Sequence, residues 1–247
     1  MARRTPSGPP PPPVVQRLRI RYAKRGRLRF TSHRDFARAF ERALRRADIP
    51  MAYSAGFSPH PKISYVGASP TGVASEAEYL EIGLARESDP EQIRTALDAA
   101  LPDGLDVLEV VPAGTGSLAE RIEAAHWRVE LPGVDPDALH EAVLGLLGRT
   151  ELSVERVTKD GRRSVDVRRA LVSAKVRPTL ALGGRAILDV VVRQVTPAVR
   201  PDDILAALRI VAGLAPDAPA VSVRVAQGPL DETGMVSDPL IPDRPPV

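Results

Sequence analysis

Residues 17 to 62 decide the fold that this sequence predicts, and they read RLRIRYAKRGRLRFTSHRDFARAFERALRRADIPMAYSAGFSPHPK. Arginines alternate with apolar side chains over residues 16–22, which is the two-residue period of a strand with one basic and one apolar face. The alternation resumes over residues 27–30 after Gly26. It predicts either a short hairpin or one strand that bends at the glycine.

A helix is predicted to begin next, at Ser32. Serine is a favourable N-cap residue, and Asp35 follows three positions later, close to the capping-box pattern. Beyond it, apolar and basic side chains separate onto opposite faces at helical spacing. Pro50 ends the helix, because proline disfavours helical geometry in the residue before it. The predicted apolar face comprises Phe36, Phe40, Ala43, Leu44 and Ala47, and the basic face comprises Arg34, Arg38, Arg42 and Arg45.

The segments that follow complete an alternating order of strands and helices. Strands are predicted at residues 62–66, 78–84 and 105–111, with a helix at 89–101 between the last two. Together with the first strand and helix they give the order β-α-β-β-α-β, which is the ferredoxin-like split unit.

The same order repeats in the second half of the chain. Strands are predicted at residues 126–131, 152–158, 164–176, 185–194 and 220–226, with helices at 135–147 and 201–211. We therefore expect an α+β protein with two tandem ferredoxin-like (βαββαβ) modules and antiparallel sheets. The expected boundaries are a disordered proline-rich arm at 1–15, the basic module at 16–112, a linker at 113–124, the second module at 125–228 and a disordered tail at 229–247.

Positive charge is concentrated in residues 17–62. Thirteen Lys and Arg accompany three acidic residues there, a net charge of +10, whereas the whole chain carries +3, so the remainder sums to −7. Such a concentration raises a positive potential on one module and favours phosphate-bearing partners.

The composition excludes several classes of site. The chain has no cysteine, so it forms no disulfide, zinc–thiolate site, cysteine nucleophile or thiolate-ligated iron–sulfur cluster of its own. It contains no phosphate-loop, dinucleotide, Gly-x-Ser-x-Gly or His-Glu-x-x-His motif, and no recognised metal-ligand spacing. No signal segment or run of about 18 apolar residues is present. We expect a cytoplasmic protein with no cofactor, no metal and no membrane partner.

The first candidate site is the polar cluster that opens the predicted helix. Free backbone amides and the helix dipole favour an anion there, and His33 and Arg34 would stand beside a docked phosphate. Arg27, Arg29 and Arg38 lie nearby in the sequence. The alternative is that Ser32 only caps the helix and that its neighbours are solvated.

The second candidate site is the loop of residues 53–62. His60 lies between two prolines and close to Lys62, so a stiff loop would present both to phosphate or to a proton transfer. Tyr53 and Phe57 are predicted to stack on unpaired bases, although aromatic side chains are more often buried in a core. The alternative is an exposed proline-rich connection. The predicted phosphate contacts are Arg27, Arg29, Ser32, His33, Arg34, Arg38, His60 and Lys62, and the candidates for acid–base catalysis are His33 and His60.

Residues 28–82 resemble a known family. They contain Arg29-Phe30 with Ser32-His33 and Asp35, the basic helix, and the run Gly56-Phe57-Ser58-Pro59-His60-Pro61-Lys62-Ile63. With these motifs the segment resembles the radical SAM-linked (radical SAM-associated) family, a domain of unknown function. Members of that family are typically encoded beside, or fused to, a B12-binding radical SAM protein, and often near ribonuclease and ribosomal-protein genes.

The resemblance implies a part in RNA modification or in another ribosome-linked process. A radical SAM core needs three thiolates for its cluster, so this cysteine-free chain is expected to be the non-catalytic partner of such an enzyme.

Three hypotheses remain open at this point. The first is an accessory RNA-binding module that grips RNA through its Arg-rich strand and helix. The second is a metal-independent RNA-processing or modifying enzyme that uses His33 or His60. The third is a protein-docking module for the radical SAM partner, since guanidinium groups pair equally with carboxylates.

Overall fold

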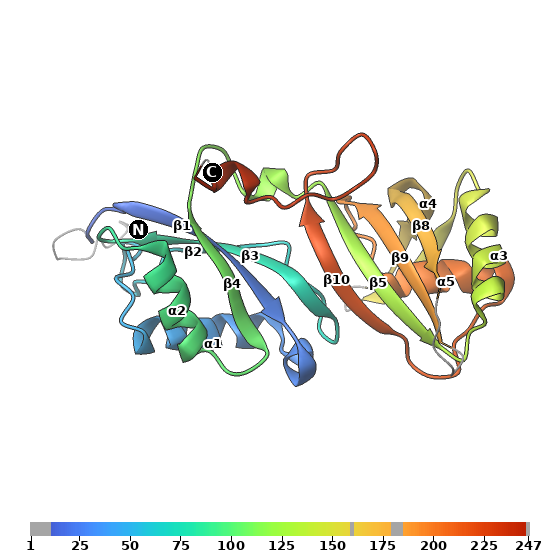
Figure 1. The fold of residues 1–247 in the computed structure, drawn as a ribbon, viewed down its shortest axis with the longest axis horizontal. Coiled ribbons are helices and arrows are strands. Elements are labelled where there is room, and N and C mark those ends of the chain that lie inside the picture. Colours follow the sequence, from blue (N-terminus) through green and yellow to red (C-terminus); the bar gives the residue numbers. More distant parts are fainter. Residues whose placement is uncertain (1–10, 159–160, 179–184, 246–247) are drawn as a thin grey trace, which may run out of the picture. The chain divides into compact units, whose positions relative to one another are not determined.

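The chain forms two compact units (Figure 1). The computed structural model describes residues 11–158, 161–178 and 185–245. The first unit contains the described parts of Met1–Glu120 and Leu240–Val247, and the second is Arg121–Pro239. Each unit combines helices with an antiparallel sheet, so the predicted α+β class is confirmed.

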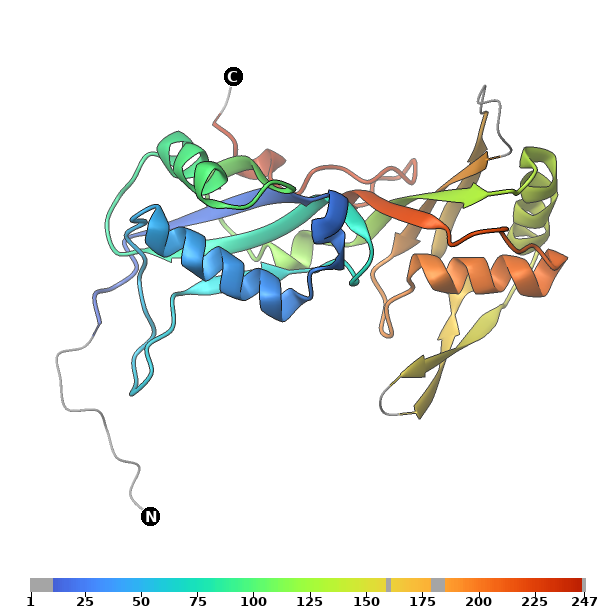
Figure 2. The same cartoon turned by 90° about the horizontal axis from the view of Figure 1, so that it is seen from below.

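The first unit has the ferredoxin-like order that the sequence predicts. Its strands are all antiparallel in the order β4-β1-β3-β2. Helices α1 and α2 cover the same face of this sheet (Figures 1 and 2). The elements are β1 (Gln16–Lys24), the 3-10 helix η1 (Gly26–Phe30), α1 (His33–Arg46), β2 (Ile63–Val66), β3 (Ala74–Leu84), α2 (Pro90–Ala100) and β4 (Leu105–Pro112).

Helix α1 begins and packs as its spacing predicts. The Ser32 hydroxyl oxygen accepts a hydrogen bond from the backbone N–H of Asp35 at 3.2 Å, which satisfies one of the free amides at the helix start. Phe36 stacks on Tyr22 of β1 with ring centroids 4.5 Å apart. Both rings belong to the core between the sheet and its two helices. The apolar stripe of α1 therefore holds the helix on the sheet and leaves its basic face outward.

Residues 27–30 do not continue the strand pattern but form η1. Gly26 turns the chain at a φ of +53°, and Leu28 donates its backbone N–H to the carbonyl of Arg25. Strand β1 already pairs with β3 on one edge and β4 on the other. The predicted second strand had no free edge beside β1, so its backbone forms local hydrogen bonds instead.

The second unit repeats the topology with an insertion. Its main sheet is antiparallel in the order β10-β5-β9-β8, and a separate hairpin, β6–β7, interrupts the βαββαβ order after α3. Helices α3 and α5 pack together, and α3 also packs on β8 and β9. The elements are β5 (Ala124–Pro132), α3 (Pro136–Leu147), β6 (Ser153–Thr158), β7 (Gly161–Asp166), α4 (Val167–Ala170), β8 (Leu171–Arg177), β9 (Arg185–Arg193), α5 (Pro201–Ala212) and β10 (Val221–Gly228).

The long strand predicted at 164–176 is divided by the short helix α4. Asp166 caps this helix by accepting a hydrogen bond from the backbone N–H of Arg169 at 3.0 Å. Val167 and Ala170 are both buried. Burial of these two small apolar residues by one helical turn lets β7 pair in the hairpin and β8 pair in the main sheet.

The chain ends differ from their predicted disorder. The first ten residues of the predicted arm lie outside the described residues, but Val15 donates its backbone N–H to Leu84 at the end of β3. Leu240 is fully buried in the first unit and Asp243 is buried beside it. In the predicted linker, Ala119–Arg121 forms the 3-10 helix η2. The prolines and acids near the C-terminus thus belong to an ordered segment that includes the 3-10 helix η3 (Ile241–Asp243).

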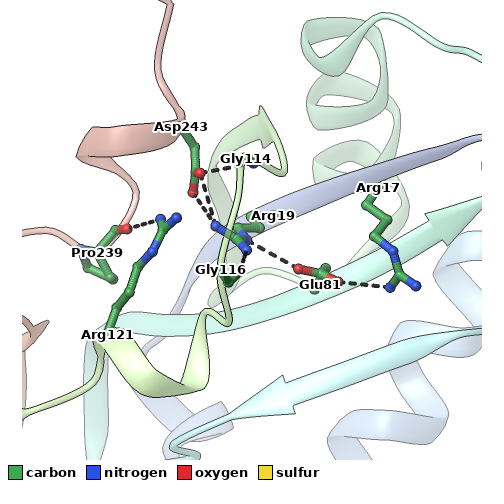
Figure 3. A network of polar contacts seen from close by, with 8 residues as sticks. All are labelled: Arg17, Arg19, Glu81, Gly114, Gly116, Arg121, Pro239 and Asp243. Atoms are coloured by element: carbon green, nitrogen blue, oxygen red, sulfur yellow. Dashed lines mark hydrogen bonds and ion pairs between the residues drawn. The ribbon is translucent and has the colours of Figure 1, made fainter.

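One buried ion pair holds this C-terminal segment on the first unit (Figure 3). Arg19 of β1 is 1% exposed, and its Nη1 lies 2.9 and 2.8 Å from the two carboxylate oxygens of Asp243. Its Nε donates to Glu81 at 3.1 Å and its Nη2 donates to the carbonyl of Gly116. Asp243 also accepts the backbone N–H of Gly114 at 3.0 Å. Because burying a charge is costly unless it is paired, this guanidinium stabilises the unit only with all these partners in place.

Replacing Asp243 by alanine is expected to lower the free energy of unfolding by about 3 kcal/mol, because the buried guanidinium of Arg19 loses a carboxylate. The matched control is Glu91→Ala, which removes a carboxylate from the exposed pair with Arg94 and is expected to cost far less. Urea unfolding followed by circular dichroism measures both variants. Equal costs would contradict a structural role for the buried pair.

Candidate functional site

The sequence predicts that the basic strand is part of a binding surface. In the structure, acidic residues of the first unit pair with its positive charges. Arg17 lies 3.0 Å from a carboxylate oxygen of Glu81, which it shares with the buried arginine of β1. Arg25, just beyond this strand, is bound by the carboxylates of Glu76 and Asp106, and the hydrogen bonds that it donates to Glu76 raise its pKa further. Arg21 donates to the backbone carbonyl of Glu76, so the arginines of this segment are held within the unit.

Helix α1 presents four arginines to solvent, which we call the arginine stripe: Arg34, Arg38, Arg42 and Arg45. Steps of three or four residues place successive members of the stripe about 4.5 to 6 Å apart along the helix axis. Arg38 Nη1 lies 3.9 Å from Asp35, and both side chains are more than half exposed, so this ion pair is weak. Within the described residues the other three members have no ion-pair partner. The stripe is a row of accessible cations.

The 3-10 helix η1 adds further cationic groups beside the start of α1. Arg27 is exposed, and the guanidinium carbon of Arg29 lies 4.7 Å from the ring centroid of Phe30, which is 59% exposed. The Nε of Arg29 is buried and has no hydrogen-bond partner among the described residues. An exposed aromatic ring with a guanidinium beside it can stack on planar groups, and the guanidinium can also bind anions.

At the first turn of α1 the capping interpretation of Ser32 agrees with the geometry. The Ser32 hydroxyl donates to the Asp35 carboxylate at 2.7 Å, so a negative group already occupies the helix N-terminus. His33 is exposed and its ring meets Tyr65 edge-on at 4.9 Å. A phosphate near this turn would meet Arg34 and His33 rather than the serine hydroxyl.

Tyr65 of β2 contacts His33 at this site, although the predicted set of site residues does not include it. Its hydroxyl is buried and has no hydrogen-bond partner among the described residues. Burial, aided by the negative charge of Glu41, raises the pKa of Tyr65. The sequence feature that could have predicted this position is the spacing of Tyr65 two residues from Ile63 in a strand, because that spacing places both side chains on one face of the sheet.

The loop of residues 53–62 is a hairpin with an exposed tip. Tyr53 pairs with Pro61, and Ser54 donates its backbone N–H to the carbonyl of His60 at 2.8 Å. Phe57 at the tip is 72% exposed and Tyr53 is 38% exposed, so neither is a core residue. His60 and Lys62 are also exposed.

The structure separates the predicted site residues into two groups. The loop leaves the C-terminal end of α1 (Figure 2), whereas the contact between His33 and Tyr65 lies at its N-terminal end. The helix has 14 residues, about 20 Å at 1.5 Å per residue. The loop that carries the second group therefore begins at the opposite end of α1 from His33. One group is Arg27, Arg29, Ser32, His33, Arg34 and Arg38, and the other is Tyr53, Phe57, His60 and Lys62.

The described residues contain no group of three or more His, Cys, Asp or Glu side chains placed to hold a metal ion. No helix among them has the length and apolar character needed to span a membrane.

The fold and the site together define a class, an α+β protein of two ferredoxin-like units with an exposed cationic helix. Residues 17–201 match the model of the family described as "Uncharacterized protein conserved in bacteria (DUF2344)", and the chain belongs to this family. The match confirms the part of the resemblance that assigned a domain of unknown function. None of the curated proteins matches the sequence.

Three solved structures show limited similarity. The first is from a Cbf5-Nop10-Gar1 complex, at 10% identity and a TM-score of 0.47 over 95% of this chain, and the match spans 58% of that chain. The second, an unknown protein from Galdieria sulphuraria, has 18% identity and a TM-score of 0.24, covering 79% of this chain and 91% of that one. The third, the first two RRM domains of yeast poly(U)-binding protein Pub1, has 11% identity and a TM-score of 0.19, covering 85% and 98%.

The variant Tyr65→Phe is expected to leave the free energy of unfolding unchanged at neutral pH or to raise it by up to about 1 kcal/mol, because the buried hydroxyl has no hydrogen-bond partner in the described part of the chain. The raised pKa of Tyr65 means that wild-type stability is fully present below the unfolded pKa of about 10 and declines above it. The variant lacks that decline. Urea unfolding at neutral and alkaline pH tests this, with exposed Tyr53→Phe as control, and a large loss at neutral pH would show that the hydroxyl has a partner.

Proposed function

We propose that this protein is a cytoplasmic accessory protein that binds RNA, of tRNA, rRNA or another ribosome-linked kind, for a B12-binding radical SAM enzyme. The observation that carries the proposal is the arginine stripe. Arg17 and Arg19 of β1 and Arg25 just beyond its end are bound by carboxylates, and Arg21 donates to the backbone carbonyl of Glu76. The described surface of α1, by contrast, keeps a row of exposed guanidinium groups. The segregation of paired from unpaired cations supports a surface for an anionic polymer.

Different residues of this surface are proposed to contact the phosphates and the bases of the RNA. Guanidinium forks bind phosphate oxygens with two hydrogen bonds, and the spacing of the arginine stripe suits successive charges on one strand. Two exposed aromatic side chains, Phe30 just before α1 and Phe57 in the loop that follows it in the chain, are available to stack on unpaired bases. This arrangement favours single-stranded or loop regions of RNA, where bases are accessible.

The radical SAM partner is inferred from the resemblance of residues 28–82 to the radical SAM-linked family. The chain has no cysteine, so the cluster of a radical SAM enzyme must be held by a different protein. In this division of labour the present protein holds the RNA and the partner carries out the radical chemistry.

Loss of stripe arginines is expected to weaken RNA binding and to reduce its salt dependence. Each phosphate contact that is removed lowers the slope of log K against log salt by about 0.7 to 0.9, so the variant R34Q/R38Q/R42Q should lose a slope of about 2 to 3. The matched control is Arg94→Gln on α2, whose guanidinium is held by Glu91. Fluorescence anisotropy with labelled tRNA over a salt series measures the slopes. A triple variant with the wild-type slope would refute the proposed contact surface.

The protein-docking alternative predicts a different result for the same triple variant. If the stripe docks on an acidic protein instead, the radical SAM partner will co-purify after nuclease treatment and the triple variant will lose it, while RNA affinity stays unchanged.

His33→Ala and His60→Ala are expected to bind RNA with at most modest loss and to show no difference in turnover from the wild type, because no carboxylate among the described residues orients either imidazole. The purified proteins are incubated with cellular RNA, and cleavage or modification is followed by gel electrophoresis and mass spectrometry. Turnover by the wild type that either variant abolishes would replace the accessory role with an enzymatic one.

A further inference from the structure

The second unit contains a cavity of about 470 Å³ on the face of its sheet opposite the helices. Along β5, Trp127, Val129 and Leu131 are buried, whereas His126 and Arg128 alternate with them on the other face. The cavity is lined mainly by β8, β9 and the segment Thr233–Val236. This position sets it apart from α1, so the inference does not depend on the proposed RNA surface.

The polar lining is built from cross-strand neighbours. Arg128 of β5 and Lys175 of β8 are both in register with Asp189 of β9, so the three side chains form a row on one face of the sheet. Two residues further along β9, His126 and Ser173 are both in register with Val191, and they form a second row. Such rows keep their spacing, because the ladder hydrogen bonds of three strands hold them.

Asp189 orients the cations of this face without neutralising all of them. Arg128 Nε lies 3.1 Å from Asp189 Oδ1, and Arg177 Nε binds Oδ2. Burial would raise the pKa of Asp189, but the hydrogen bonds from Arg177 and Arg128 outweigh it and lower that pKa, so the carboxylate is ionised. Among the groups that line the cavity, the two cations Lys175 and Arg177 exceed the one carboxylate of Asp189 by one charge, and Arg128, bound to Asp189 beside the cavity, adds a further positive charge.

The half-buried imidazole of His126 adds a polar group of a different kind. Its Nε2 lies 3.4 Å from Asp189 Oδ1. Burial lowers its pKa despite the nearby carboxylate, so the ring is neutral at pH 7 and offers hydrogen bonds without a charge. The polar side of the cavity thus combines two flexible cations, Lys175 and Arg177, with the Ser173 hydroxyl and a neutral ring.

A preformed turn supplies the apolar rim. Asp231 accepts hydrogen bonds from the backbone N–H groups of Thr233 and Met235, each at 2.9 Å, and Leu230 pairs with Val236. Met235 is 67% exposed at the cavity, and Val191 contributes to its floor. An exposed methionine is a flexible apolar contact that suits planar rings.

We propose that this cavity binds a small phosphate monoester with a ring-bearing body of nucleotide size, its phosphate on Lys175 and Arg177 and its body against Met235. A phosphate monoester carries about −1.5 to −2 charges at pH 7, which matches the positive excess of the face. The volume lies within the range of about 300 to 1,000 Å³ that is usual for small-ligand sites. Arg128 and Asp189 act as positioning residues in this site.

The test is titration calorimetry of the full chain with adenosine 5′-monophosphate, uridine 5′-monophosphate and ribose 5-phosphate, and with adenosine and uridine as uncharged counterparts. The phosphorylated probes are expected to bind, and the nucleosides to bind at least about tenfold more weakly. Lys175→Gln and Arg177→Gln should each weaken phosphate-probe binding at least about tenfold, because each removes a charge-assisted contact.

The matched control is Arg163→Gln, which removes an exposed cation of the β6–β7 hairpin that does not line the cavity. It should bind as the wild type does. Lys175 and Arg177 are exposed, so all three variants should keep the wild-type melting temperature. Absence of binding of every phosphorylated probe at millimolar concentration would overturn the proposal, as would an equal loss in the control. Loss of RNA affinity in the cavity variants without monophosphate binding would overturn it in favour of an RNA surface on this unit.

Discussion

The buried ion pair between Arg19 and Asp243 is the constraint on which the first unit depends. Its partners are 224 positions apart in the sequence, and the carboxylate is placed by a segment that follows all the strands and helices of the second unit. A guanidinium that is 1% exposed tolerates that position only when carboxylates and carbonyls surround it. The C-terminal segment is therefore part of the first unit's interior, although its sequence is rich in prolines and acids.

This constraint also sorts the positive charge of residues 17–62. Strand β1 lies among acids of β3, β4 and the C-terminal segment, because neighbouring strands and the returning chain contribute Glu81, Asp106 and Asp243. Helix α1 lies on the other face of the sheet, where the arginine stripe has only the weak ion pair with Asp35 among the described residues. The net charge of the segment thus divides into a structural part on the strand and an accessible part on the helix.

The two units use equivalent positions of one topology in different ways. In the first unit Arg19 of the first strand is in register with Glu81 of the third, and in the second unit Arg128 is in register with Asp189 at the same places in the order. Asp243 covers the first pair and buries it. The second pair borders a cavity instead, and its acid remains in contact with a further arginine and with a histidine. The same cross-strand pair is structural in one unit and part of a candidate binding site in the other.

The sequence by itself determined the α+β class, the repeated βαββαβ order, the capped start of α1 and its two faces, because strand and helix periods and N-caps are local properties of neighbouring residues. It did not determine that residues 27–30 form a 3-10 helix, which follows from both edges of β1 being occupied. Only the tertiary structure decided which arginines are neutralised and that His33 of α1 lies against Tyr65 of β2. It also brought His126, Lys175 and Asp189 together. The physical reason is that charge pairing and cavity formation depend on distances between elements remote in the sequence, on which local periodicity carries no information.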